Sequence, residues 1–134
     1  MTAGRDEEIV RSLREFYDAF NRGDYDNAIG FAHPDVEYIP AAGQTPLHGT
    51  DQLRAWMEPS AFERQILEPE DITVAGDKVL MRVHSTIRGA GSGIEMEIDM
   101  WTVMTVDGNG LATRVETFFR HEEREARVAA GLPA

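Results

Sequence analysis

The period of the hydrophobic pattern changes near residue 60, and this change constrains the fold more than any other feature of the chain. Before it, apolar residues recur every three or four positions, as they do along the buried face of a helix. After it, apolar and polar residues alternate over long stretches separated by glycine-rich turns, which is typical of antiparallel strands with one buried face. Helices followed by a series of hairpins predict an α+β fold.

Start and stop signals place the individual elements within a single domain that covers residues 1–134. Gly23 and the His-Pro pair at 33–34 end the first two helices, because glycine closes a helix readily and the residue before proline disfavours helical angles. We expect helices at 6–21, 24–32, 50–58 and 122–130. We expect strands at 36–39, 62–75 (broken by Pro69), 79–88, 94–106 and 111–120, with connections at 75–78, 89–93 and 107–110.

Charge and composition narrow the classes of function. The formal net charge of −11 argues against nucleic acids and anionic membrane surfaces, since both attract basic proteins. No apolar run approaches the length of a transmembrane helix, and the N-terminal sequence MTAGRDEEIV lacks the apolar stretch of a secretory signal. The absence of cysteine excludes disulfides and thiolate chemistry. We therefore expect a cytoplasmic protein that binds neither nucleic acid nor membrane.

The alternation assigns the strand residues to the two faces of a sheet. The more apolar set comprises Val79, Met81, Val83, Ser85, Ile87, Ile98, Met100, Thr102, Met104, Val115, Thr117 and Phe119, and we expect it to form a concave face beneath the helices. The opposite set includes Arg82, His84, Glu97, Asp99, Glu116, Arg120, Trp101, Val103 and Phe118. Large apolar groups among charges of both signs fit a two-fold dimer interface, and the alternative is a solvated surface.

Three segments carry a family resemblance that spans nearly the whole chain. They read LREFYDAFNRGDYDNAIGFAHPDVEY, LHGTDQLRAWM and TVMTVDGNGLATRVETFFR, and the strongest markers are NRGD at 21–24, HPDV at 33–36, the HG before the third helix and the closing EARVAAGL. In these segments the chain resembles the NTF2-like superfamily, and within it the SnoaL-like branch of polyketide cyclases, ketosteroid isomerases and limonene epoxide hydrolases. The resemblance implies a cone in which three N-terminal helices pack on a strongly curved, mostly antiparallel sheet that encloses an apolar pocket, usually in a dimer.

The catalytic residues of these relatives are not matched position by position. Ketosteroid isomerases use a carboxylate base and an oxyanion hole built from a tyrosine and a neutral acid. The positions that correspond here hold Tyr38 or Ile39, Phe16 with Tyr17 beside it, and Thr102. The inner face carries none of the acids that epoxide hydrolases use, and Arg120 stands where cyclases often have aspartate.

We therefore predict a largely apolar pocket, suited to a flat hydrophobic ligand held by one or two hydrogen bonds. Its predicted ligand-binding residues are Phe16, Phe20, Trp56, Met57, Met81, Met100, Thr102, Met104, Thr117 and Phe119, with Ser85 as a further polar point. The acid–base candidates are Tyr17, Tyr38 and His48. Each also has an ordinary explanation, since helical aromatic residues are often core, a strand tyrosine can reach water, and His48 can hold the turn before the third helix.

Residues 37–49, EYIPAAGQTPLHG, connect a strand to the third helix and correspond to the pocket mouth in the relatives. Glu37 alternates away from the cavity if Tyr38 faces it, so we expect a rim without a base. The four histidines lack the spacing of metal ligands, and HEERE at 121–125 lacks the second histidine of the HExxH zinc motif. We expect neither a metal nor another cofactor.

Three functions remain open. The first is a SnoaL-like small-molecule enzyme of isomerase, cyclase or hydrolase type that acts on a hydrophobic, polyketide- or steroid-like compound. The second is a non-catalytic binding protein for a small hydrophobic ligand. The third is an interaction module in which the outer sheet face pairs with itself or with another subunit. We expect a homodimer through the outer sheet face. The choice depends strongly on Asp99, which alternation aims outward but which a single bulge would turn into the pocket.

Overall fold

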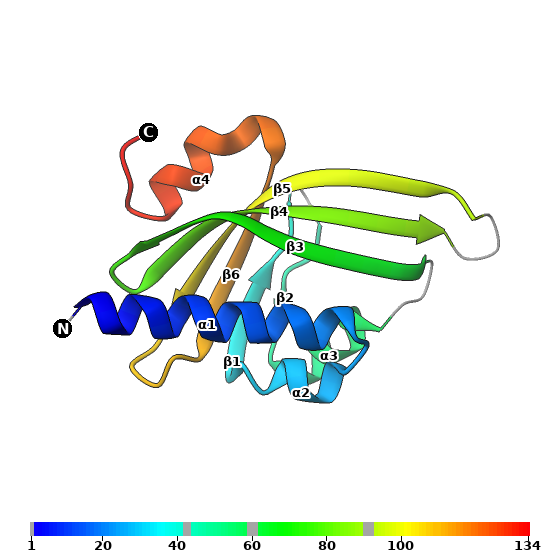
Figure 1. Cartoon of the computed structure of the whole chain (residues 1–134), viewed down its shortest axis with the longest axis horizontal. Coiled ribbons are helices and arrows are strands. Elements are labelled where there is room, and N and C mark those ends of the chain that lie inside the picture. The colour runs from blue at the N-terminus through cyan, green and yellow to red at the C-terminus, as the bar shows by residue number, and fades with distance from the viewer. Residues whose placement is uncertain (1, 42–43, 59–61, 90–92) are drawn as a thin grey trace.

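The computed structural model describes residues 2–41, 44–58, 62–89 and 93–134, and it shows helices packed on a curved, unclosed sheet (Figure 1). The helices are α1 (Thr2–Asn21), α2 (Tyr25–Ile29), α3 (Thr50–Met57), the 3-10 helix η1 (Arg120–Glu122) and α4 (Glu123–Ala129). The strands are β1 (Ala32–Ile39), β2 (Leu47–His48), β3 (Phe62–Ala75), β4 (Lys78–Gly89), β5 (Glu95–Val106) and β6 (Ala112–Phe119). Among the described residues, no helix combines the length and the apolar character needed to cross a membrane.

The strands form one sheet in the order β2-β1-β6-β5-β4-β3. Every neighbouring pair is antiparallel except β1 and β6, which are parallel. Helices α1, α2 and α3 lie on one side of this sheet and α4 lies on the other (Figure 1). The predicted α+β cone, with three N-terminal helices on a curved and mostly antiparallel sheet, is therefore confirmed.

Helix α1 supplies the largest apolar stripe to the concave face. Ile9, Leu13, Tyr17 and Phe20 recur at spacings of three or four residues, and each is between 2% and 6% exposed. Burial of a side chain such as leucine or isoleucine stabilises the fold by about 1.5–3 kcal/mol. Tertiary packing of this stripe, more than helix propensity, therefore fixes α1 on the sheet.

The predicted division of residues between the two faces is confirmed along the central strands. Thr102 is 5% exposed and pairs with Met81 on β4 and with Thr117 on β6, all of them members of the inner set. Asp99 lies opposite His84 in the outer set. The register between β4 and β5 runs without a shift, so no bulge turns Asp99 toward the concave face.

The connection between α2 and β1 differs from its prediction. The helix predicted at 24–32 ends early because Phe31 leaves the helix, and its carbonyl accepts a hydrogen bond from the Ala112 N–H at 2.9 Å. That bond ties the chain to β6, so β1 begins at Ala32. Pro34, which lacks an N–H, is accommodated within β1 because the register with β6 shifts in this part of the strand.

Strand β3 continues through Pro69, where the sequence predicts a break. It lies at the edge of the sheet, where a proline need not donate to a neighbouring strand. The irregularity comes two residues later, where Asp71 adopts a φ of 51° and the register with β4 shifts. Asn21, the last residue of α1, fixes the strand in place, because its side-chain amide donates to the Leu67 carbonyl and accepts from the Leu67 N–H, both at 2.9 Å.

Turns at two ends of the long strands follow the prediction. Gly76 and Gly110 adopt φ values of 67° and 80°, a conformation that favours glycine in tight hairpins. Asp107 closes the second turn by accepting hydrogen bonds from the Asn109 and Leu111 N–H groups at 2.8 and 3.0 Å. Residues 90–92 of the predicted connection at 89–93 lie outside the described residues.

Helix α4 covers the apolar part of the convex face. The buried centre of this contact consists of Leu80, Val103, Ala126 and Ala130. Trp101 and Phe118 pack against it, and the Trp101 indole N–H donates to the Arg120 carbonyl at 3.2 Å. The large apolar groups on which the predicted dimer interface was based are therefore packed with α4 of the same chain, because the C-terminal segment folds back over the sheet.

Candidate ligand-binding cavity

A cavity of about 160 Å³ lies between the helices and the concave face of the sheet. Helices α1 and α3 contribute one side of its wall, and strands β1, β3, β4, β5 and β6 contribute the other. The predicted residues found in the wall are Phe16, Tyr17, Phe20, Tyr38, Trp56, Met57, Ser85, Met100, Thr102, Met104 and Thr117. The fold thus brings these side chains around one space, and their part in ligand binding stays a prediction.

Two predicted ligand-binding residues lie outside this wall. Met81 has the inner orientation but is completely buried, in a core cluster with Ile9 and Leu13 of α1, so the helix leaves no open space above it. Phe119 is 38% exposed at the end of β6, and its ring stacks on that of His121 with 5.8 Å between centroids. Alternation gives the face of the sheet on which a residue lies but not whether a helix covers it, and this explains both positions; a part of Met81 and Phe119 in ligand binding stays a prediction.

The structure does not bring His48 into the wall with the two tyrosines. It lies exposed on β2, opposite Glu37 of β1. Its backbone N–H donates to the side-chain oxygen of Gln52 at 2.8 Å, so this residue helps to hold the start of α3. A catalytic role for its imidazole stays an untested prediction.

Wall residues on β3 escaped the sequence analysis. Gln65 and Leu67 lie opposite Ile87 and Ser85 of the inner set. Counting pairs back from the turn at 75–78 would place Leu67 on the convex face, because the register shift after residue 70 reverses the alternation. The sequence contains no clear signal for that shift. Leu53 of α3, Val83 of β4 and Val115 of β6 complete the wall.

Tyr17 and Tyr38 are the ionisable groups of the described wall, and both keep their protons at neutral pH. Burial raises the pKa of Tyr17, and repulsion from Tyr38 raises it further. Burial also raises the pKa of Tyr38, to about 12, although a hydrogen bond with Thr117 acts in the opposite direction. A phenol in this state can donate a hydrogen bond but cannot serve as a general base.

Aromatic contacts hold the two tyrosine rings. Tyr17 lies edge-to-face on Phe16 with 4.9 Å between centroids, and Tyr38 lies against the Trp56 ring at 4.7 Å. The Thr117 hydroxyl donates to the Ile39 carbonyl at 3.2 Å, which joins β6 to the strand that carries Tyr38. The hydroxyls are thus carried by packed rings, as a pre-organised donor site requires.

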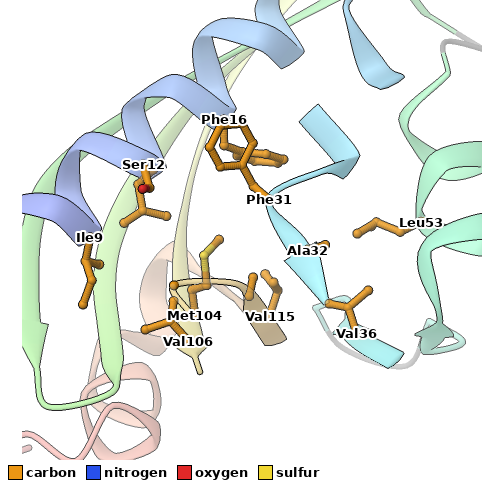
Figure 2. A pocket seen from close by; sticks show the side chains of 13 residues that line it. Ile9, Ser12, Phe16, Phe31, Ala32, Val36, Leu53, Met104, Val106 and Val115 are labelled. Atoms are coloured by element: carbon orange, nitrogen blue, oxygen red, sulfur yellow. The ribbon is translucent and has the colours of Figure 1, made fainter. Parts of the chain in front are cut away.

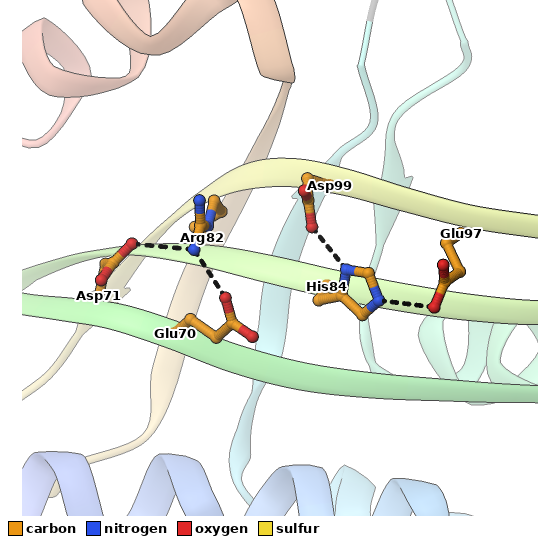
Figure 3. A network of polar contacts seen from close by, with 6 residues as sticks. All are labelled: Glu70, Asp71, Arg82, His84, Glu97 and Asp99. Carbon is orange, nitrogen blue, oxygen red and sulfur yellow. Dashed lines mark hydrogen bonds and ion pairs between the residues drawn. The ribbon is translucent and has the colours of Figure 1, made fainter.

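The described residues of the wall include no Asp, Glu, His, Lys or Arg. Those residue types gather instead on the convex face, where Figure 3 shows a charged network on β3, β4 and β5. The His84 imidazole lies 2.7 Å from Asp99 through Nδ1 and 3.3 Å from Glu97 through Nε2. Next to it, Arg82 lies 2.7 Å from Glu70 and 3.3 Å from Asp71. Among the described residues, no three His, Asp or Glu side chains are arranged to hold a metal ion.

The network shifts the titration of its own members. The hydrogen bonds that His84 makes with Asp99 and then with Glu97 raise the pKa of the imidazole, because they favour its charged form. The hydrogen bond with His84 in turn lowers the pKa of Asp99. The carboxylate of Asp99 is therefore held by His84 on the face of the sheet opposite to the cavity.

The segment 37–49 follows the predicted alternation at its start. Glu37 is exposed, whereas Tyr38 lies in the cavity wall. Strand β2, whose Leu47 pairs with Tyr38, was not expected from the sequence. Trp56 of α3 is 42% exposed, so the cavity wall reaches the protein surface at this residue. Residues 42–43 of the segment lie outside the described residues.

A cone of three helices on a curved sheet, with an apolar cavity between them, is the architecture of NTF2-like proteins. The family model of the SnoaL-like domain matches residues 13–115, and the chain belongs to this family. The predicted resemblance is thereby confirmed. No functionally curated protein matches this sequence.

Solved structures share the fold at low sequence identity. An NTF2-like protein of unknown function from Burkholderia pseudomallei K96243 is 21% identical, with a TM-score of 0.74 over 88% of this chain and 95% of that one. The epoxide hydrolase/cyclase-like enzyme SalBIII, described in pyran ring formation in the polyether salinomycin, is 16% identical, with a TM-score of 0.76 over 84% and 91%. A Mycobacterium tuberculosis protein in complex with estradiol-17β-hemisuccinate is 14% identical, with a TM-score of 0.73 over 84% and 94%.

Proposed function

We propose that this protein is a small-molecule enzyme of the SnoaL-like isomerase, cyclase or hydrolase type, and that its substrate is a hydrophobic, polyketide- or steroid-like compound with a carbonyl oxygen. The observation that carries the proposal is the presence of two protonated phenols, Tyr17 and Tyr38, in the wall of an otherwise largely apolar cavity. A carbonyl oxygen that gains negative charge during a reaction would accept hydrogen bonds from these hydroxyls. In a site of low dielectric constant, such bonds stabilise the developing charge more than water does.

The remaining wall residues would bind the body of the substrate. Rings and methyl groups would contact the aromatic and methionine side chains, and the methionines would adapt to their shape. Thr102 and Gln65 offer further hydrogen bonds to a second polar group. Loss of a proton next to the activated carbonyl would deliver that proton to water, because none of the described wall residues is a base at neutral pH.

Two of the similar structures support this class of substrate. SalBIII is named for ring formation in a polyether, and the mycobacterial protein holds a steroid ester. Polyethers and steroid esters are both hydrophobic molecules that carry oxygen atoms. Their identities of 16% and 14% carry the fold to this chain, and the substrate class is an inference from the cavity.

The second candidate is a non-catalytic binding protein for the same kind of compound. The observation that favours it is the lack of a carboxylate or imidazole among the described wall residues. In this case the two phenols would select ligands with an oxygen acceptor, and the bound molecule would stay unchanged.

We further propose a cytoplasmic homodimer that associates through the part of the convex face beyond α4. This surface carries cations and anions side by side, with Arg82 and His84 next to Glu70 and Asp99 (Figure 3). A two-fold axis can set such a mixed surface against its own copy with opposite charges in contact. Sedimentation velocity at micromolar concentration should give a dimer for the wild type and a monomer for His84→Glu; a wild-type monomer would contradict the proposal.

Binding of a matched pair of naphthalenes tests the donor site. 2-Acetonaphthone carries a carbonyl group, and 2-ethylnaphthalene has a similar shape without the oxygen. We expect the ketone to bind more tightly, and we expect Tyr38→Phe to weaken ketone binding about threefold to tenfold while leaving the hydrocarbon unaffected, as the loss of one hydrogen bond predicts. Equal loss for both compounds would assign Tyr38 to packing alone.

Hydrogen exchange separates the enzyme from the binding protein. The α-protons of 2-acetonaphthone are replaced by deuterium in D₂O when the ketone enolises, and proton NMR follows this loss. The enzyme proposal predicts exchange above the buffer rate that falls about a hundredfold in the Tyr17→Phe, Tyr38→Phe double variant, the lower end of the range for a removed oxyanion donor. A bound ketone that exchanges at the buffer rate would support the binding protein.

A further inference from the structure

A second and smaller hollow lies beside the cavity, between the middle of α1, the first part of β1, the end of β5 and the first part of β6 (Figure 2). We call it the distal hollow. Its volume is about 40 Å³. A hollow needs about 10–15 Å³ to hold one water molecule, so there is room here for a small chemical group.

The distal hollow is more apolar than the main cavity. Ser12 contributes the one hydroxyl among its described wall residues, and the rest of the wall consists of aliphatic, aromatic and methionine side chains with one glycine. Hollows lined in this way remain free of water and accept apolar guests. The polar groups of the main cavity, including both tyrosines, are absent from the described part of this wall.

The two spaces share a partition made by Phe16, Leu53, Met104 and Val115, which belong to both walls. In Figure 2 the side chains of Phe16, Met104 and Val115 converge on the hollow from α1, β5 and β6. The Met104 side chain is unbranched and adapts readily to a neighbouring group. The Phe16 ring lies edge-to-face with the rings of Tyr17 and Phe31, with 4.9 and 6.3 Å between centroids. It therefore contacts the donor site on one side and the hollow on the other.

The main cavity and the distal hollow together therefore have one polar side and one apolar side. Hydrogen-bond donors lie on one side of Phe16, and an almost purely hydrocarbon surface lies on the other. A molecule that spans both would have its oxygen atoms at one end and an unsubstituted hydrocarbon group at the other. A compound with polar groups at both ends would leave one of them without a partner, which is costly.

We infer that the distal hollow is a binding subsite for a short alkyl substituent of the ligand, and that Phe16 sets how far the ligand reaches into it. The inference rests on the proposed function, because it takes the ligand's oxygen to lie at Tyr17 and Tyr38. It adds the requirement that the opposite end of the molecule be hydrocarbon. The competing explanation is a packing defect that no ligand uses, since protein interiors contain a few small voids.

A series of substituted ketones measures the use of the hollow. The series is 2-acetonaphthone with hydrogen, methyl, ethyl or propyl at carbon 6, the position most distant from the acetyl group. Quenching of tryptophan fluorescence gives each Kd, because Trp56 lies in the wall of the main cavity. We expect the Kd to fall about fourfold for each added carbon, the gain from removing one methylene from water, until the hollow is full.

The matched variants are Ser12→Leu and Ser12→Ala. Ser12 lies on α1 and is half-buried, so leucine at this position fills the hollow from the helix side without disturbing a strand. Ser12→Ala removes the same hydroxyl and leaves the space open. We expect the Kd of Ser12→Leu for the unsubstituted ketone to lie within twofold of the wild-type value. The affinity of this variant should not rise with added carbons, whereas that of Ser12→Ala should rise as in the wild type. Ala112→Val narrows the hollow from β6 and replaces Ser12→Leu should that variant fail to fold.

Xenon detects the hollow independently of any ligand chemistry. Under xenon pressure, the methyl NMR signals of Val106 and Ala112 should shift in wild type and Ser12→Ala, and should not shift in Ser12→Leu. If xenon binds but the gain in affinity per added carbon is equal in Ser12→Leu and Ser12→Ala, the subsite is overturned. If Ser12→Leu abolishes the gain in affinity per carbon but Tyr38→Phe leaves the Kd of the ketone unchanged, the subsite is supported and the donor site of the proposed function is overturned.

Discussion

The concave and convex faces of β4 and β5 carry opposite chemistry, although their residues alternate along the same two strands. On the concave face, Ser85, Met100 and Thr102 line a cavity with no charged side chain among its described residues. One residue away, His84 and Asp99 form an ion pair on the convex face. The ionisable groups of the cavity are phenols whose raised pKa values keep them neutral, whereas the pKa shifts of His84 and Asp99 on the convex face favour their charged forms.

This difference indicates what chemistry each face can support. Charged groups on the convex face are paired with each other and remain partly solvated, which limits both their energetic cost and their reactivity. The cavity offers hydrogen-bond donors without a neighbouring base, so it can bind and polarise an oxygen atom but cannot itself remove a proton. A shift of one residue in the register would exchange the two sets completely.

The sharpest way to break this separation is to place an acid in the cavity. In Thr102→Glu the carboxylate would be buried without a partner, and we expect a loss of about 3–5 kcal/mol in the free energy of unfolding at pH 8. Burial raises the pKa of such an acid above its usual value near 4.3. The loss should therefore shrink as the pH falls below the raised pKa toward about 4, where most of the acid is neutral in both states. Urea denaturation at several pH values measures it.

Thr105→Glu is the matched control on the same strand. Thr105 lies on the convex face, where the Lys78 ammonium is 3.4 Å from its hydroxyl and Arg114 is its partner on β6. A glutamate here meets cations, and we expect a change within about 0.5 kcal/mol, as for most surface substitutions. Equal losses for the two variants would show that the faces do not differ in the way described.

A second comparison separates core from cavity within the concave face. Met81 is completely buried, and we expect Met81→Ala to cost about 2–5 kcal/mol because it leaves a void in a packed core. Met100 is partly exposed in the cavity wall, and Met100→Ala should cost about 1 kcal/mol, the typical effect of a single substitution. Ketone binding should respond in the opposite order, weakening more in Met100→Ala. Similar losses of stability at both positions would place Met81 in the cavity wall after all.

The pKa shifts of His84 and Asp99 on the convex face predict how the stability of the protein depends on pH. The pKa of His84 is raised in the folded state, so its stabilising contribution is full below the unfolded pKa near 6.5 and is lost as the pH rises through the folded pKa. The pKa of Asp99 is lowered, so its contribution is present above the unfolded pKa near 3.9 and is lost as the pH falls. The pair therefore stabilises most between about pH 4 and 6.5.

Thermal unfolding of His84→Gln checks this window. The difference in Tm from wild type should be largest near pH 5.5 and should become small by pH 9. His121→Gln, which removes an exposed imidazole outside the network, serves as the control and should show no such maximum. A His84→Gln difference that stays constant from pH 5 to 9 would exclude the charged pair as its cause.

The sequence predicted the faces of the sheet well because alternation is a local property. It placed Thr102 inward and Asp99 outward, and the unbroken register between β4 and β5 keeps that assignment. It could not tell core from cavity, as Met81 shows, because depth depends on where α1 crosses the sheet. It also missed Gln65, because the register shift near Asp71 reverses the alternation of β3. The docking of α4 on the convex face depends on contacts distant in sequence, which a local pattern does not encode.

The infrared carbonyl stretch of ¹³C-labelled 2-acetonaphthone bound in the cavity reports directly on hydrogen bonds from the two tyrosines. If Tyr17 and Tyr38 donate hydrogen bonds to the ligand's oxygen, the stretch lies at a lower frequency in the wild type than in the Tyr17→Phe, Tyr38→Phe double variant, where it approaches the value in an apolar solvent. If the wild type and the double variant both bind the ketone and give the same frequency, the two tyrosines do not donate hydrogen bonds to its oxygen.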